Sequence, residues 1–161
     1  MKRKTLLSAL TLGAVLAFSS NTLLAQKSKK PELAKEGRSL EELLPKGWEA
    51  QHGTGDLNKD GIEDIILIAH PNFPENKKKR DDGYEYDFNP AILAVYFGSP
   101  TGVYQRFKVW KEAVPHREDE YTEIGVELSV TPKGAVDFNV SSWSSMGTAD
   151  TGSTTYRYRY Q

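Results

Sequence analysis

The stretch that decides the fold reads Gly55-Asp56-Leu57-Asn58-Lys59-Asp60-Gly61-Ile62-Glu63-Asp64-Ile65-Ile66. Its oxygen-bearing side chains are spaced so that a tight loop can surround one hard cation with carboxylate, amide and backbone oxygens, the ligands that calcium prefers. Leu67 stands where an EF-hand loop needs a bidentate Glu, inside an apolar run at residues 65–69 that is typical of a buried strand rather than a helix. The sequence therefore predicts a metal-binding β unit.

Strand signals surround this loop and continue along the chain. Residues 48–52 lead into the loop and residues 65–69 lead out of it. Residues 91–97 (AILAVYF) form a second apolar run, as expected for a central strand covered on both faces. Further strands are expected at 103–110, 124–130, 135–140 and 154–160, between turns that contain Gly or Pro. The predicted fold class is mainly β, an antiparallel sheet arranged as a meander or a sandwich, with one short N-terminal helix.

The helix is predicted from Ser39-Leu40-Glu41-Glu42, a capping box in which the Ser hydroxyl and a Glu carboxylate each bond an orphan backbone donor. Pro45 and Gly47 end it after little more than one turn. At the other end of the chain, three tyrosines alternate with two arginines. If this segment is a strand, Tyr156, Tyr158 and Tyr160 share one face, and we expect them to be buried with Arg157 and Arg159 in solvent.

The N-terminus has the pattern of a secretory signal peptide. A basic start (Lys2, Arg3, Lys4) precedes an apolar stretch at 6–18, and small residues follow, with cleavage expected after Ala25. We therefore predict a signal peptide at 1–25, a flexible polar leader at 26–38, and a β domain at 39–161 that contains the calcium-type loop at 55–66. The expected location is periplasmic or secreted, with no membrane span after cleavage.

Composition narrows the possible functions. The chain has no cysteine, so an exported domain of this kind must draw its stability from packing or from a metal. Of 21 basic and 22 acidic residues, three basic ones lie in the predicted signal peptide, which leaves 18 basic residues in the mature chain. This acidic balance argues against nucleic acid as a partner, since such a partner requires a basic face.

Residues 55–66, together with Tyr96-Phe97-Gly98, resemble the calcium loop and the aromatic-Phe-Gly phrase of FG-GAP/VCBS repeats, the β-hairpin units of integrin-type propellers. The resemblance covers residues 53–97 and implies calcium as the cofactor. It assigns as ligands the side chains of Asp56, Asn58, Asp60 and Asp64 and the carbonyl of Ile62. A propeller needs about four to eight blades, and one copy of the motif cannot close such a ring. The chain is thus similar to a small exported bacterial protein with one calcium loop.

A metal-free turn is the alternative for this loop, because Asp-Gly is also a strong hairpin signal. Three carboxylates within one short loop argue against it, since they repel one another without a cation and only Lys59 offers local compensation.

A second candidate site lies in the long connection at 71–90. It combines cations with aromatic rings, a mixture that attracts anionic groups and offers contact area. We expect binding to an anionic glycan or a cell-surface protein through Lys77, Lys78, Lys79, Arg80, Tyr84 and Tyr86, with Trp143 adding to an aromatic platform. The alternatives are a solvated loop tip for the cations and core packing for the rings.

No catalytic constellation is predicted. The three histidines lack zinc spacing, and residues 141–145 (SSWSS) lack a nucleophile elbow and belong to a predicted flexible loop at 141–153. The leading hypothesis is a non-enzymatic binding or adhesion-type module outside the cytoplasm, stabilised by calcium. The alternatives are a hydrolase acting on extracellular polymers, or a secreted inhibitor or accessory protein that docks through residues 77–88. Two facing acids in a cleft would favour the hydrolase, and a flat face with exposed Tyr and Trp would favour the binding module.

Overall fold

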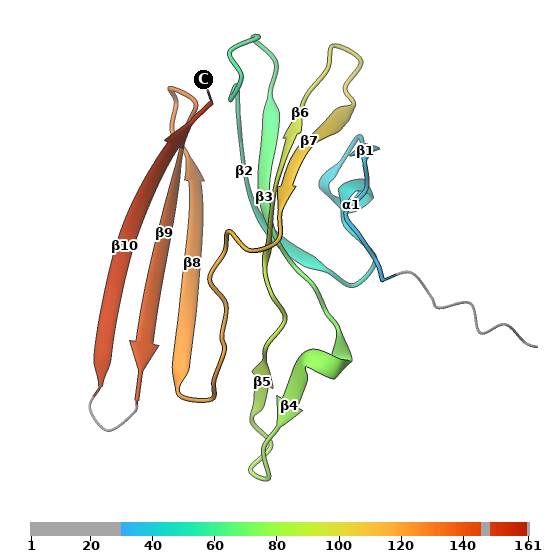
Figure 1. Ribbon diagram of the computed structural model, residues 1–161. Coiled ribbons are helices and arrows are strands. Elements are labelled where there is room, and N and C mark those ends of the chain that lie inside the picture. The colour runs from blue at the N-terminus through green and yellow to red at the C-terminus, as the bar shows by residue number, and fades with distance from the viewer. Residues whose placement is uncertain (1–29, 146–148, 161) are drawn as a thin grey trace, which may run out of the picture. The chain divides into compact units, whose positions relative to one another are not determined.

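Five strands pair around the two apolar segments in the computed structural model, which describes residues 30–145 and 149–160 (Figure 1). The sheet order is β1-β7-β6-β3-β2, and each neighbouring pair is antiparallel. The strands are β1 (Glu36–Gly37), β2 (Glu49–Gly55), β3 (Asp64–His70), β6 (Ile92–Phe97) and β7 (Tyr104–Trp110). The predicted central position of the apolar runs is confirmed, because β3 and β6 lie inside the sheet. Side chains cover both of their faces.

One face of this sheet is covered by the N-terminal part of the domain. Helix α1 (Leu40–Leu43) is capped by Ser39, whose hydroxyl accepts a bond from the Glu42 N–H at 3.4 Å, so the predicted short helix is confirmed. Leu43, Leu33 and Trp48 pack there in a cluster with the odd-numbered residues of β3. Because Leu33 belongs to that cluster, the folded part of the domain begins before the helix.

The predicted flexible leader at 26–38 is therefore wrong for residues 31–38. Leu33 is only 6% exposed, β1 pairs with β7, and the Tyr96 hydroxyl donates to the Ala34 carbonyl at 2.9 Å. The polar composition hid the single apolar anchor that holds this segment. Residues 26–29 and the predicted signal peptide at 1–25 lie outside the described residues. None of the described helices is long and apolar enough to span a membrane.

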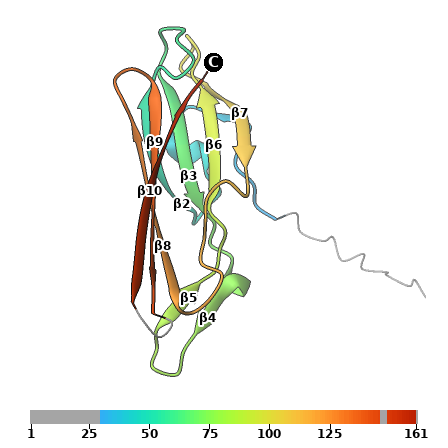
Figure 2. The same cartoon turned by 60° about the vertical axis from the view of Figure 1, so that its left-hand side comes forward.

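The C-terminal part of the chain forms a second, three-stranded antiparallel sheet in the order β10-β9-β8, labelled in Figure 1 and in Figure 2. Its strands are β8 (Thr122–Val130), β9 (Ala135–Ser144) and β10 (Asp150–Arg159). The predicted flexible loop at 141–153 is wrong for residues 141–144 and 150–153, which belong to β9 and β10, with Ser141 directly opposite Ser153. Residues 146–148 of that prediction lie outside the described residues. Hydroxyl side chains on an exposed sheet face give a loop-like composition, although the backbone forms a regular ladder.

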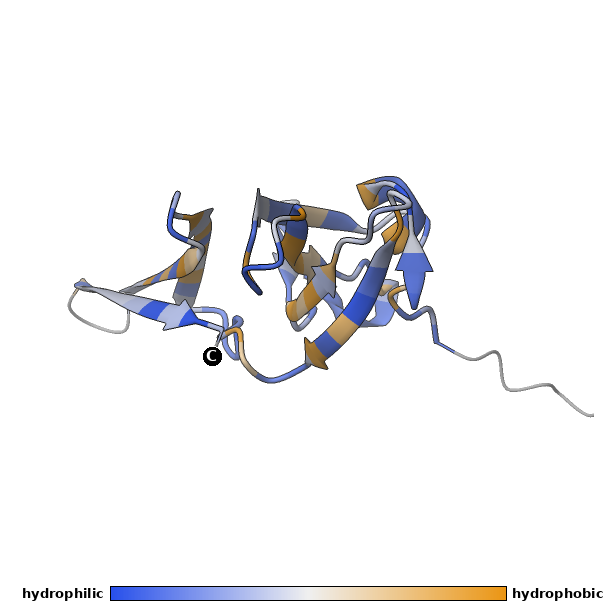
Figure 3. Ribbon diagram, turned by 90° about the horizontal axis from the view of Figure 1, so that it is seen from above, coloured by the Kyte–Doolittle hydropathy of each residue, from blue (hydrophilic) through white to orange (hydrophobic). Residues whose placement is uncertain are grey.

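Hydrophobic and hydrophilic residues alternate along these strands, as Figure 3 shows along the ribbons. The hydrophobic faces of the two sheets pack against each other. The inner face of the second sheet contributes Val136, Phe138 and their neighbours on β8 to two clusters with the even-numbered residues of β3. The sheets also meet where β2 approaches β8. There the Gln51 side chain donates to the Val126 carbonyl at 2.9 Å, and a Cβ on Gly53 would lie 2.7 Å from Val130 Cγ2. The sandwich-like arrangement thus depends on small residues in β2.

The prediction for the last strand is right about the face and wrong about burial. Tyr156 lies opposite Phe138 and Tyr158 opposite Val136, so both share the apolar side of the sheet. They nevertheless remain 47% and 59% exposed, and Tyr160 is 46% exposed. The reason is that β10 is the edge strand of a sheet, and its rings reach beyond the area that the larger sheet covers. Arg157, on the opposite face, pairs with Asp137 through two bonds of 2.5 and 2.6 Å.

Candidate functional site

The loop at 56–62 is folded around its own side-chain oxygens. Asp56 accepts bonds from the N–H groups of Asp60 and Gly61, both at 3.0 Å. Asn58 shares the Asp60 N–H at 3.0 Å and donates its amide to the Asp60 carboxylate at 2.9 Å. Lys59 and Gly61 adopt positive φ angles of 66° and 84°, which turn the chain tightly enough for these bonds. The first three predicted ligand side chains therefore meet within one turn.

Asp64 follows this loop in the sequence and binds its backbone. It is the most buried of the predicted ligands, with no exposed surface. One of its carboxylate oxygens accepts bonds from the N–H groups of Leu57 and Asn58 at 2.8 and 3.2 Å. The other accepts from the Gly98 N–H at 2.9 Å. Such charge-assisted bonds from backbone donors are what a buried carboxylate needs. Asp64 thus links the loop to the end of β6.

Gly98 completes that link by allowing a close approach of two backbone segments. A Cβ at this position would lie 2.1 Å from the Glu63 carbonyl oxygen, so only glycine lets the chain after β6 pass this close to the loop. The phrase Tyr96-Phe97-Gly98 therefore has a local structural reason: the tyrosine is buried, and the glycine reaches Asp64.

The donor set of the loop fits a hard cation such as calcium, since all of its side-chain ligands are oxygens. Each carboxylate oxygen of Asp56 and Asp60 accepts one N–H bond and keeps a second lone pair, as does the Asp64 oxygen that faces Gly98. The carbonyl of Ile62 would complete the set that the resemblance implies. Across residues 30–145 and 149–160, no group of three or more His, Cys, Asp or Glu side chains gathers as a metal site. Calcium binding accordingly stays a prediction, with Asn58 and backbone oxygen needed beside the carboxylates.

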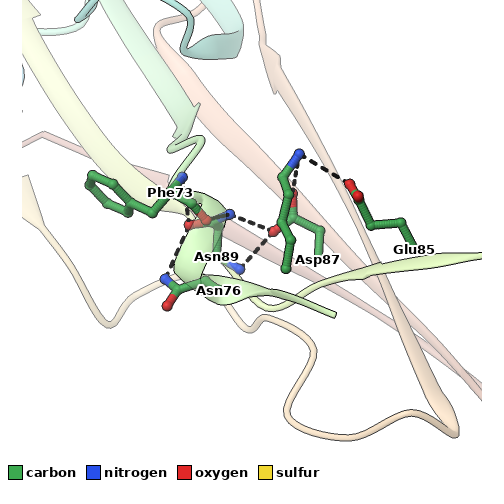
Figure 4. Close-up of polar contacts among 6 residues, drawn as sticks. Phe73, Asn76, Glu85, Asp87 and Asn89 are labelled. Atoms are coloured by element: carbon green, nitrogen blue, oxygen red, sulfur yellow. Dashed lines mark hydrogen bonds and ion pairs between the residues drawn. The ribbon is translucent and has the colours of Figure 1, made fainter. Parts of the chain in front are cut away.

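The second predicted site is a hairpin rather than an irregular loop. After a 3-10 turn (Pro74–Asn76), β4 (Lys77–Lys79) pairs with β5 (Glu85–Asp87). Asn89 fixes its base: the Asn89 side chain accepts bonds from the Phe73 N–H and the Asn76 amide and donates to Asp87 (Figure 4).

The cations of this hairpin are largely matched by acids. Lys77 lies 3.4 Å from a Glu85 oxygen and 3.8 Å from an Asp87 oxygen. Lys78 pairs with Glu120, and Arg80 pairs with Asp82 at 3.0 Å, while no ion pair involves Lys79 among the described residues. The Glu120 partner raises the pKa of the Lys78 ammonium, first through a hydrogen bond and then through charge. The run Lys77–Arg80 is therefore compensated, and its attraction for anions is weaker than its sequence indicates.

The predicted aromatic residues of this second site separate into buried and exposed ones. Tyr86 is buried, with the Arg117 guanidinium 5.1 Å from the centre of its ring. Tyr84 is 49% exposed and reaches Glu123 of β8, with the two oxygens 3.4 Å apart. Trp143 is 43% exposed and lies directly opposite Glu123 in the second sheet. The structure thus brings Tyr84 and Trp143 to the same carboxylate.

A third site, which the sequence did not predict, lies between the two sheets. It is a cleft of about 430 Å³ whose walls come from Ile66 and Val95 of the larger sheet and from Val136, Phe138 and Tyr158 of the smaller one. Its aromatic rim contains a stacked Phe97–Phe107 pair with ring centres 4.6 Å apart, and Tyr160 meets both rings edge-on. Trp110 also lines the cleft, with the Lys108 ammonium 5.1 Å from its ring centre.

Two sequence signals point toward this cleft. Residues 124, 126, 128 and 130 alternate as Ile, Val, Leu and Val, which predicts one apolar face that needs a covering layer. Residues 97–110 and 156–160 contain more aromatic side chains than the larger sheet buries. Phe107, for example, remains 47% exposed. The sequence does not indicate the distance between the two sheets. That distance determines whether these rings fill a closed core or line a cleft.

Comparison with known proteins gives no match: no family model, no curated protein and no solved structure is similar to this chain.

Proposed function

We propose that this protein is a non-enzymatic binding module that holds the apolar chain of a single-chain amphiphile in the cleft between its two sheets. The observation that carries the proposal is the cleft itself, since its volume of about 430 Å³ lies inside the range of about 300–1,000 Å³ common for small-ligand sites. Its lining is apolar and aromatic apart from Gly134 and Arg159. An aliphatic chain has the shape and the polarity that such walls accept.

The chemistry of the lining also distinguishes a binder from a hydrolase. Hydrolysis of polymers commonly uses a pair of carboxyl groups or a nucleophile with a base, placed at the reacting bond. None of the described residues that line the cleft is an Asp, Glu, His or Ser. The Lys108 ammonium lies near the Trp110 ring and Arg159 lines the cleft, so an anionic head group would meet two cations there. These features support a carrier or binding role and give the hydrolase alternative no catalytic groups in the cleft.

We place this activity outside the cytoplasm and give calcium a stabilising role. The basic and apolar N-terminal sequence supports export. Asp56, Asn58, Asp60 and Asp64 would hold calcium together with the Ile62 carbonyl. The ion would balance the negative charge of the loop and fix it against the end of β6. The FG-GAP/VCBS-like loop then acts as a structural part of a single domain.

The binding proposal is tested by calorimetric titration of the protein with laurate below its micelle concentration. Phe107→Asp places a charge on an exposed ring of the rim, and we expect it to weaken laurate binding at least about tenfold, or about 1.4 kcal/mol. Tyr121→Asp is the matched control, because Tyr121 is an exposed aromatic that does not line the cleft. No heat of binding with the natural protein, or equal affinities of both variants, would contradict the proposal.

A further inference from the structure

The outer face of the second sheet carries an exposed aromatic ring beside a carboxylate. Trp143 and Glu123 are direct cross-strand partners, so their side chains leave the sheet on the same side. By alternation, this is the side opposite Phe138 and the cleft. Trp143 is 43% exposed, although a large apolar ring gains free energy from burial. The ring is thus displayed on a surface that the core does not require.

A second ring is held at the same carboxylate by the hairpin of β4 and β5. The Tyr84 hydroxyl lies 3.4 Å from a Glu123 oxygen, and an Arg117 nitrogen lies 3.2 Å from the same oxygen. Arg117 also contacts the Tyr86 ring, and Lys78 pairs with Glu120. These contacts connect the tip of the hairpin to the beginning of β8. The two exposed rings, Tyr84 and Trp143, therefore both lie next to Glu123.

The surface beyond Trp143 on this face is built from small polar side chains. Ser141 pairs with Ser153 across the ladder, and Asn139 bonds the Thr155 hydroxyl at 2.9 Å. The Ser153 hydroxyl donates to the side-chain oxygen of Asn139 at 3.3 Å. Residues of this kind form a shallow surface that offers both donors and acceptors of hydrogen bonds. An extended chain lying along the strands would meet these groups together with the exposed Glu127, which lies opposite Asn139.

We propose that the face formed by Tyr84, Glu123 and Trp143, extended by Asn139 and Ser141, is a binding site for a neutral, hydroxyl-rich glycan. The C–H groups of a sugar ring carry partial positive charge and pack on the negative faces of Tyr and Trp rings. The Glu123 carboxylate accepts hydrogen bonds from sugar hydroxyls, and the amide and hydroxyl groups beyond it do the same along the chain. The site is independent of the cleft, because it lies on the opposite face of the sheet.

Charge is what selects a neutral glycan over an anionic one. Arg117 and Lys78, the cations of this surface named above, are each paired with a Glu. Glu123 is half-exposed and balances Arg117, so the centre of the site offers a sulfate or carboxylate on the ligand no excess positive charge. The expectation of an anionic glycan at Lys77–Arg80 is thus replaced here by a neutral glycan at an adjacent surface.

The test is binding of the full chain to a panel of immobilised neutral polysaccharides (β-glucan, xylan, mannan and dextran), with dextran sulfate as the charged probe. We expect binding to at least one neutral polymer, reduced about tenfold or more in Trp143→Ala and several-fold in Glu123→Gln. The matched control is Tyr158→Ala, which removes an exposed ring from the opposite face and should leave glycan binding unchanged.

The outcomes decide between this site and its competitors. Retention on no neutral polymer overturns the proposal, as does binding that survives Trp143→Ala and Glu123→Gln together. Preference for dextran sulfate over every neutral polymer also overturns it and returns the role to the hairpin cations. Loss of glycan binding with unchanged laurate binding would support this site separately from the cleft. Circular dichroism of each variant shows whether a loss comes from unfolding.

Discussion

Asp64→Asn is the substitution that most directly tests how the loop is held to the sheet. It keeps the size and shape of the side chain but replaces one carboxylate oxygen by an NH₂ group, which cannot accept a hydrogen bond. In the natural protein both oxygens accept bonds, two from the loop at 2.8 and 3.2 Å and one from Gly98 at 2.9 Å. Whichever way the amide turns, at least one backbone N–H faces another donor.

The size of the effect follows from the number and burial of these bonds. The less costly orientation keeps the oxygen toward the loop and leaves the Gly98 N–H opposed to an NH₂ group. Losing a charge-assisted bond and leaving its donor without a partner costs about 2–4 kcal/mol, because the two effects overlap rather than add. The carboxylate is fully buried, so water cannot replace the missing acceptor easily.

The assay is urea unfolding followed by tryptophan fluorescence, with a calcium chelator present so that only hydrogen bonding differs. Asp60→Asn is the control, since Asp60 is exposed and its loss should cost less than about 1 kcal/mol. Equal midpoints for the two variants would refute the reasoning, because they would show that the three backbone bonds to Asp64 contribute little. A change in the slope of the transition would point instead to an altered denatured state.

Three further predictions concern stability. Gly134→Ala should destabilise by more than 2 kcal/mol, beyond the roughly 1 kcal/mol expected for Gly102→Ala. Both glycines have φ near +70°, but only at Gly134 would the new Cβ clash, 2.5 Å from a loop carbonyl oxygen; equal losses would contradict the clash. Tyr158→Ala should cost about 1 kcal/mol and Phe138→Ala about 3–5 kcal/mol, because only the second ring is buried; equal costs would show that β10 is covered in solution. Calcium at 100 times its dissociation constant should add about 2.7 kcal/mol to the free energy of unfolding, and Asp60→Ala should lose the gain; midpoints unaffected by chelator would reject the structural role.

Most of the fold could be predicted because its strongest signals are local. Apolar runs, the capping box at Ser39 and Gly-containing turns each depend on a few neighbouring residues, and they lead to the observed strands and helix. The predictions that failed concern segments whose structure depends on contacts with residues distant in the sequence. Leu33 is a single apolar residue in a polar segment, and only contact with a distant sheet makes it part of the core. The serine-rich end of β9 is a strand because β10 pairs with it, which no local propensity indicates.

The candidate sites divide in the same way. The loop could be predicted because its ligands are close in sequence, whereas the role of Asp64 as acceptor for Gly98 needs contact across 34 positions. Of the cations at 77–80, Lys77 and Arg80 pair with acids of the same segment, whereas the pairing of Lys78 with Glu120 needs contact across 42 positions. The cleft could not be predicted because its walls come from two sheets whose separation depends on how closely β2 approaches β8.

The loop and the cleft are not separate parts, and this gives a last prediction. Leu57 lines the cleft with its side chain, while its N–H donates to Asp64 at 2.8 Å. Gly134 also lines the cleft, and a Cβ at this position would lie 2.5 Å from the Asp56 carbonyl oxygen. A variant that loosens the loop, such as Asp64→Asn, should therefore weaken laurate binding even where the protein is still folded, by at least about threefold, whereas Asp60→Asn should not. The measurement is calorimetric titration without urea, after circular dichroism has shown both variants to be native. Unchanged laurate affinity in Asp64→Asn would mean that the cleft wall is held by its apolar contacts alone, since Leu57 would then keep its place without the bond that fixes its backbone.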